Sequence, residues 1–101
     1  MPLSGKTLTS GRKVVAAAGT PEALVAVPTE AIYTVIAAET NNTGMVVIGG
    51  TDVDETLATR TGIPLNPGEM SPVLPVDDLV EVYIDVNVSG DGVTFIYLSP
   101  S

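Results

Sequence analysis

Carboxylates are the side chains of this chain whose types and spacing could bind a metal or move a proton. Asp52, Asp54 and Glu55 lie close together in one turn-rich segment, and Asp77 and Asp78 open a later strand. Carboxylate oxygens are hard ligands that suit calcium, but neither cluster has the spacing of a calcium-binding loop with its closing bidentate Glu. The clusters are typical of solvated turns, and we expect no metal and no other cofactor.

The usual catalytic side chains are missing. The 101 residues include no Cys and no His, which removes thiol nucleophiles, Cys/His zinc sites and imidazole acid–base chemistry. A Ser–Lys pair would need Lys6 or Lys13 near the N-terminus, and paired carboxylates of a glycosidase need a deep cleft that a domain of this length rarely builds. Gly49-Gly50-Thr51 has no following Lys or helix to make a phosphate loop. We predict that the protein is not an enzyme.

Charge is divided unevenly along the chain. Residues 1–13 contain Lys6, Arg12 and Lys13 and no acidic residue, whereas the remainder contains Arg60 and all twelve acidic residues. An acidic body repels the phosphate backbone, so we expect no nucleic-acid partner. The apolar runs are too short to span a bilayer, and the first residues contain no apolar stretch of a secretory signal. We expect no membrane association and no export.

The elements that must position these side chains are strands. Val, Ile and Thr supply 33 of the 101 residues, and side chains branched at Cβ favour a pleated sheet. Period-two alternation is clearest over residues 80–88, and the Gly-rich link 89–92 leads into a second apolar run. This pattern predicts a β-hairpin over residues 80–98. Its expected core residues are Val80, Val82, Ile84, Val86 and Val88, and its expected outward residues are Glu81, Tyr83, Asp85 and Asn87.

Turn residues divide the rest of the chain into further short strands. We expect a second hairpin over residues 31–49, with the apolar segment 45–48 as a central strand. Residues 49–68 are expected to form a surface loop with one helical turn at 54–59. Pro72 and Pro75 confine the strand at 69–76 to a sheet edge or a bulge. The remaining expected strands cover residues 12–18, 23–27 and 93–98.

The fold class that follows is all-β: one compact antiparallel β-sandwich or small barrel of about seven short strands. Residues 14–101 are expected to form this domain. Residues 1–13 contain few apolar side chains and are expected to form an extended basic N-terminal arm. The alternative for the arm is a frayed N-terminus with no function.

Four motifs occur in a fixed order over residues 31–98. They are N-T-G followed by an apolar strand and a glycine pair (42–50), G-I-P-L-N-P-G-E (62–69), D-D-L (77–79) and S-G-D-G-V (89–93). This order resembles small all-β structural proteins of tailed bacteriophages, which are head decoration or cement proteins, head-fibre bases and tail or neck attachments. The resemblance implies neither a catalytic residue nor a cofactor.

The resemblance implies a capsid decoration protein that is made in the host cytoplasm and binds the outer head surface of the virion. Its implied partners are the major capsid protein and further copies of itself, as a homotrimer. Lys6, Arg12 and Lys13 are the expected capsid-binding residues, because an extended basic arm can add a strand to a sheet edge and is attracted to an acidic shell. The alternatives are a head-fibre or tail/neck attachment module and, from a different class, a carbohydrate-binding module.

Overall fold

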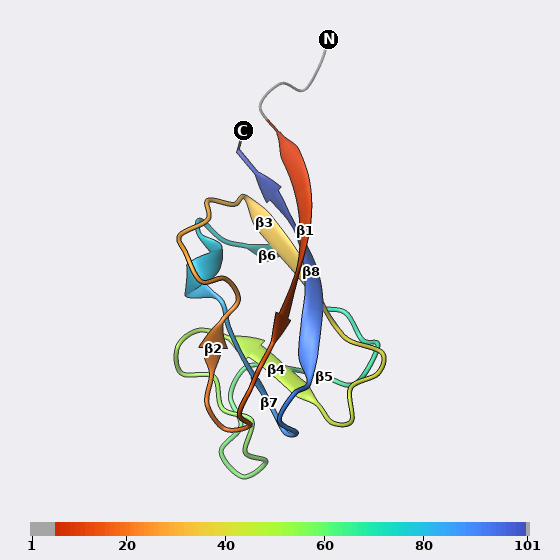
Figure 1. Ribbon diagram of the computed structural model, residues 1–101. Coiled ribbons are helices and arrows are strands. Elements are labelled where there is room, and N and C mark those ends of the chain that lie inside the picture. Colours follow the sequence, from red (N-terminus) through yellow and green to blue (C-terminus); the bar gives the residue numbers. More distant parts are fainter. Residues whose placement is uncertain (1–5, 101) are drawn as a thin grey trace.

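Two four-stranded antiparallel sheets pack face to face in the computed structural model, which describes residues 6–100 (Figure 1). The first, here called sheet A, has the strand order β1-β8-β3-β6 and the second, sheet B, has the order β2-β7-β4-β5. This β-sandwich confirms the expected fold class and decides between sandwich and barrel.

Sheet A consists of β1 (Thr7–Val14), β8 (Gly92–Ser99), β3 (Tyr33–Ala38) and β6 (Leu74–Pro75). Sheet B consists of β2 (Glu22–Ala23), β7 (Tyr83–Val86), β4 (Val46–Gly49) and β5 (Ile63–Leu65), and the 3-10 helix η1 (Leu79–Glu81) precedes β7.

The core lies between the two sheets and is built by alternate residues of the longer strands. In β8, for example, Val93 and Phe95 are buried, whereas Thr94 and Ile96, which alternate with them, are exposed. In β3, Ile36 is buried. Period-two alternation therefore works as the sequence predicts for a sheet with one buried face. The core cluster comprises Val15, Leu24, Ala31, Ile36, Ala38, Val46, Ile48, Leu65, Leu79, Val82, Ile84, Val86, Val93 and Phe95.

Neither expected hairpin forms. β7 pairs with β2 and β4, whereas β8 pairs with β1 and β3, so the link 87–91 carries the chain from one sheet to the other. β3 and β4 likewise belong to different sheets. Glycine-rich links fit both a tight hairpin and an arch between sheets, and alternation along a strand does not say which strand lies beside it. The expected hairpins were therefore wrong in pairing although their strands exist.

The expected faces of residues 80–88 are correct at the centre and wrong at the ends. Val82, Ile84 and Val86 are in the core, but Val88 is 38% exposed because it lies in the link. Val80 is only partly buried and belongs to η1. Asp85, an expected outward residue, is buried.

The expected boundary at residue 13 between an arm and the sandwich is wrong, because Thr7–Val14 form strand β1. All eight of its residues pair with β8, from Thr7 opposite Ser99 to Val14 opposite Gly92. The strand has few apolar side chains because it lies at a sheet edge, where most of its residues are exposed. Gly11 is required there, since the ring of Phe95 lies where any side chain at this position would begin. The part of the expected arm at residues 1–5 lies outside the described residues.

Proline has the expected effect on strand position. β6, which ends at Pro75, is an edge strand of sheet A and only two residues long. β4 is a central strand of sheet B, as its apolar residues on both faces predict. The segment 49–68 is not only a loop, because Ile63–Leu65 form β5 on the edge beside β4.

Candidate functional site

The first acidic cluster stabilises its own turn. Asp54 accepts hydrogen bonds from the Thr56 N–H (2.9 Å) and the Thr59 hydroxyl (2.6 Å), and these bonds hold the pKa of Asp54 below its ordinary value. Glu55 accepts a hydrogen bond from the Asn87 side-chain amide at 2.6 Å. These bonds fasten the loop to itself and to the end of β7. Within residues 6–100 no group of three or more acidic, His or Cys side chains is arranged to hold a metal.

The second acidic cluster caps a helix. The side chain of Asp78 accepts hydrogen bonds from the N–H groups of Thr29 (2.8 Å) and Val80 (3.0 Å), so it is the N-cap of η1. An Asp in this position satisfies main-chain donors that the first helical turn leaves free. The role of this cluster is therefore to position a connection.

Two buried carboxylates were missed by sequence reasoning. Asp91 accepts hydrogen bonds from the N–H groups of Thr43 and Gly44, and the Gly44 bond is 2.8 Å long. Asp85 accepts from Gly19 N–H at 3.0 Å and from its neighbour Val86 N–H at 2.8 Å, while burial raises the pKa of Asp85. Both carboxylates join segments distant in sequence. The available signal was an Asp inside or directly before a valine-rich strand, which periodicity assigns to solvent.

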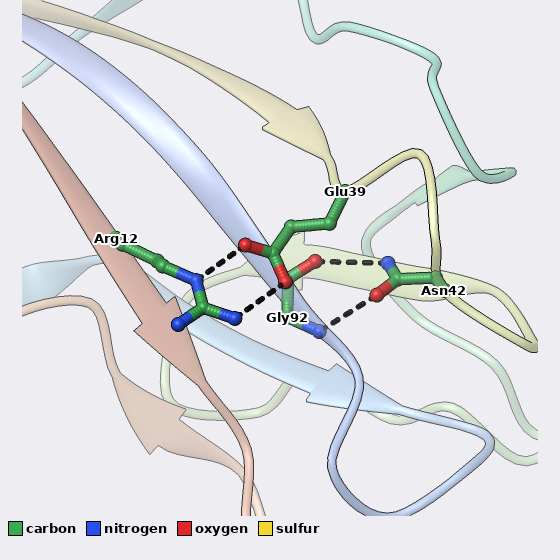
Figure 2. Close-up of polar contacts among 4 residues, drawn as sticks. All are labelled: Arg12, Glu39, Asn42 and Gly92. Carbon is green, nitrogen blue, oxygen red and sulfur yellow. Dashed lines mark hydrogen bonds and ion pairs between the residues drawn. The ribbon is translucent and has the colours of Figure 1, made fainter.

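Arg12 is paired within the protein. Its guanidinium reaches over β8 to Glu39 at the end of β3, with Nε 2.5 Å from Oε2 and Nη2 3.2 Å from Oε1 (Figure 2). The hydrogen bond to Glu39 raises the pKa of Arg12. Beside this pair, the side-chain amide of Asn42 donates to the Gly92 carbonyl and accepts from the Gly92 N–H, as a neighbouring strand would (Figure 2).

Lys13 is also paired, but with the other sheet. Its Nζ lies 2.8 Å from Oε1 of Glu22 in β2, and the other Glu22 oxygen accepts from the Ala16 N–H. These bonds lower the pKa of Glu22. Lys6 is exposed just before β1. Two of the three expected capsid-binding cations are therefore neutralised by the protein's own carboxylates, and the three do not converge on one site.

The strands of sheet A contain no acidic residue. None of the twelve lies in β1, β3, β6 or β8, so Arg12 and Lys13 are the charged residues of these strands. The register aligns three rows of outward residues across β1, β8 and β3. The rows are Leu8–Leu98–Tyr33, Ser10–Ile96–Val35 and Arg12–Thr94–Ala37.

These rows make an apolar groove. It has a volume of about 550 Å³, and its lining includes Arg12, Val35, Ala37, Met70 and Ile96. Met70 is 68% exposed and Ile96 39%, so large apolar side chains of the groove are open to solvent. Exposed contiguous apolar surface on a soluble protein marks a site of interaction with another macromolecule. We therefore take this groove and its three rows, here called the sheet A face, as the candidate site.

Comparison with known proteins gives no match: no family model, no curated protein sequence and no solved structure is significantly similar to the chain. Among residues 6–100 there is also no helix that is long and apolar enough to cross a membrane. Function is therefore inferred from the geometry of the sheet A face and from the motifs of the sequence.

Proposed function

We propose that the protein is a structural component of a bacteriophage virion, a decoration protein that attaches to the outer surface of the capsid. The observation that carries the proposal is the sheet A face, an apolar surface whose strands contain no acidic residue on a chain of net charge −8. The motif order of residues 31–98, which resembles phage decoration and head-fibre proteins, supports the same role.

The distribution of charge suits attachment by one face. No acidic residue lies in a strand of sheet A. Glu39, which neutralises Arg12, follows β3, and Glu22, which neutralises Lys13, lies in β2 of sheet B. Acidic surfaces of free subunits repel one another and keep the protein dispersed. An apolar face without acidic residues has no such barrier to a protein partner, so the sheet A face is the surface we assign to the major capsid protein.

Attachment through this face has a different salt dependence from attachment by a basic arm. Because Arg12 and Lys13 are already paired, few free cations remain to attract an acidic shell. Apolar contact is not screened by salt, whereas attraction between exposed charges weakens as ionic strength rises. We expect occupancy on the capsid to persist at high salt.

The decisive experiment is quantitative mass spectrometry of purified virions of the phage that encodes the chain. Decoration requires a copy number comparable to that of the major capsid protein. A few copies per particle would favour the head-fibre or tail/neck alternative, and absence from the particle would overturn both.

A matched pair of variants tests the face itself. Ile96→Lys places a charge in the groove, and we expect it to abolish binding to capsids stripped of the protein. Leu57→Lys is the control, because Leu57 is 82% exposed in the loop after β4, away from sheet A. Equal loss of binding in both variants would remove the sheet A face from the proposal.

A further inference from the structure

The outer edge of β1 is an open sheet edge. β1 pairs with β8 on one side, and on the other side it has no neighbouring strand among residues 6–100. Its eight residues make it, with β8, the longest strand of the described chain. From Thr7 to Gly11 it contains neither charge nor proline, the two devices that most often block an exposed edge.

Antiparallel geometry decides which main-chain groups face outward. The Val15 N–H donates to the Asp91 carbonyl, which continues the pairing of β1 with β8 by one residue. Because the direction of main-chain groups alternates along a strand, Thr7, Thr9, Gly11 and Lys13 also point theirs at β8. The N–H and C=O groups of the residues between them point to the open edge. The residues that face the open edge in this way are Leu8, Ser10, Arg12 and Val14. No hydrogen bond within residues 6–100 satisfies their main-chain groups.

The other three sheet edges are blocked. β6 and β2 are two residues long, and β6 contains Pro75. β5 is three residues long and contains Pro64. A short or proline-containing edge offers too few main-chain donors to template another strand. Among the described strands, β1 is therefore the one edge able to accept a partner.

We propose that two copies of this chain pair through β1, antiparallel and about a two-fold axis, so that the two A sheets become one continuous sheet. With Ser10 on the axis, Leu8 lies opposite Arg12 of the second copy and Thr9 lies opposite Gly11. No like charges then face each other. The side chain of Leu8, which is 59% exposed, packs on the aliphatic stem of Arg12.

The distribution of charge favours a second copy as the occupant. Each copy has a net charge of −8, but β1 contains no acidic residue, and Glu39 and Glu22 neutralise its Arg12 and Lys13. The β1 edge is therefore where two acidic subunits meet with least repulsion. An acidic strand of a different protein would gain little attraction from Arg12 and Lys13, because Glu39 and Glu22 already pair with them.

The number of open edges also selects two-fold pairing. A closed trimer made by strand pairing needs two different edges on each subunit, because its interfaces are heterologous. With one usable edge, strand pairing is isologous and ends at a dimer. The homotrimer implied by the family resemblance is therefore the competing outcome.

The first experiment is sedimentation equilibrium of the isolated protein over a range of concentrations and salt. We expect a species of twice the 10.3 kDa chain mass. Since each copy is strongly acidic, added salt should tighten the dimer, in contrast to an attachment made by opposite charges. A trimer, or a monomer at every concentration, would overturn the proposal.

Two neighbouring proline substitutions locate the interface. Ser10→Pro removes an outward N–H and should weaken the dimer at least 100-fold while the melting temperature of the monomer changes little. Thr9→Pro is the matched control, because its N–H points at β8, so it should lower the melting temperature. If the dimer survives Ser10→Pro, β1 does not form the interface. If the isolated chain is a monomer and Ser10→Pro abolishes capsid binding, the edge binds a strand of the shell and the second-copy proposal is wrong.

A cross-link tests the register without a loss of fold. The chain contains no Cys, so Ser10→Cys introduces one thiol, and antiparallel partners at a hydrogen-bonded pair lie about 5.5 Å apart, within disulfide reach. We expect rapid oxidation to a covalent dimer, and no such dimer from the control Thr94→Cys on β8. This pairing does not depend on the proposed function, since it is measured on the isolated protein. A failure here leaves the capsid test unaffected.

Discussion

The outer faces of the two sheets differ in what covers them. In sheet A, the central outward residues Val35 and Ile96 line an open groove. In sheet B, the corresponding central pair Val47 and Asp85 is buried, each with 1% of its surface exposed. Both sheets bury their inner faces in the same core, so the contrast concerns the outer faces alone.

The chain itself covers sheet B. Val53 of the loop after β4 lies against Gly49, and Glu55 of the same loop bonds to Asn87. The turn before β2 is held by the hydrogen bond from Gly19 to Asp85. No described loop closes over the centre of the sheet A face in the same way, since Ile96 remains 39% exposed. Within residues 6–100, the chain's own loops therefore cover the outer face of sheet B, whereas the outer face and the β1 edge of sheet A stay open to solvent.

The strongest test of the difference between the two outer faces is to place the same charge on both. Val47→Lys forces a longer side chain and a charge into a covered, closely packed site beside Asp85, and we expect it to lower the free energy of unfolding by about 3 kcal/mol or more. Val35→Lys, on the half-buried sheet A face, should cost less than about 1 kcal/mol, because its ammonium can reach water. Urea denaturation of both variants measures the difference. Similar losses would show that the two faces are equally covered.

The inner faces should respond alike. Ile36 in sheet A and Ile84 in sheet B are both fully buried in the core. Each substitution by Ala should cost about 2 to 4 kcal/mol through lost burial and a residual cavity. Chemical denaturation checks this, and a loss below about 0.5 kcal/mol at either residue would mean that its face is assigned wrongly.

Asp85, on the covered outer face of sheet B, makes the stability of the protein depend on pH. Burial raises its pKa, so the folded state favours the protonated carboxyl and its ionised form opposes folding at neutral pH. Asp85→Asn should therefore leave the protein as stable or more stable at neutral pH, by up to about 1 kcal/mol. This advantage should disappear as the pH falls into the range where the wild-type Asp85 takes up its proton. Melting temperatures of both proteins from neutral to acidic pH test the sign. An advantage of the variant that grew on acidification would contradict it.

The smallest effect is expected at the exposed ion pair of β1. Arg12→Gln removes the contact with Glu39, and exposed pairs contribute less than about 1 kcal/mol. We expect a small change in melting temperature for Arg12→Gln. Lys13→Gln should leave capsid occupancy unchanged, because Lys13 pairs with Glu22 of β2 and lies outside the three rows of the sheet A face. If Lys13→Gln abolished capsid binding in a folded protein, attachment would depend on the basic segment after all.

Local chemistry, read from the sequence, determined much of the monomer. Branched side chains and period-two alternation predicted an all-β sandwich or small barrel and the core positions Val82, Ile84 and Val86. Pro75 confined β6 to an edge, and the apolar run at 46–48 placed β4 at a centre. These features could be predicted because each depends on the residue itself or on its immediate neighbours.

Tertiary structure alone decided which strands are neighbours and which faces are covered. The link 87–91 crosses between sheets, so β7 and β8 pair with strands far away in sequence. Thr7–Val14 form an edge strand because all eight residues pair with β8, although most of their side chains are polar. Asp85 is buried because a loop and a turn from elsewhere cover its face. Alternation divides a strand into two faces, but the partner of each face and edge comes from distant parts of the chain or from another molecule.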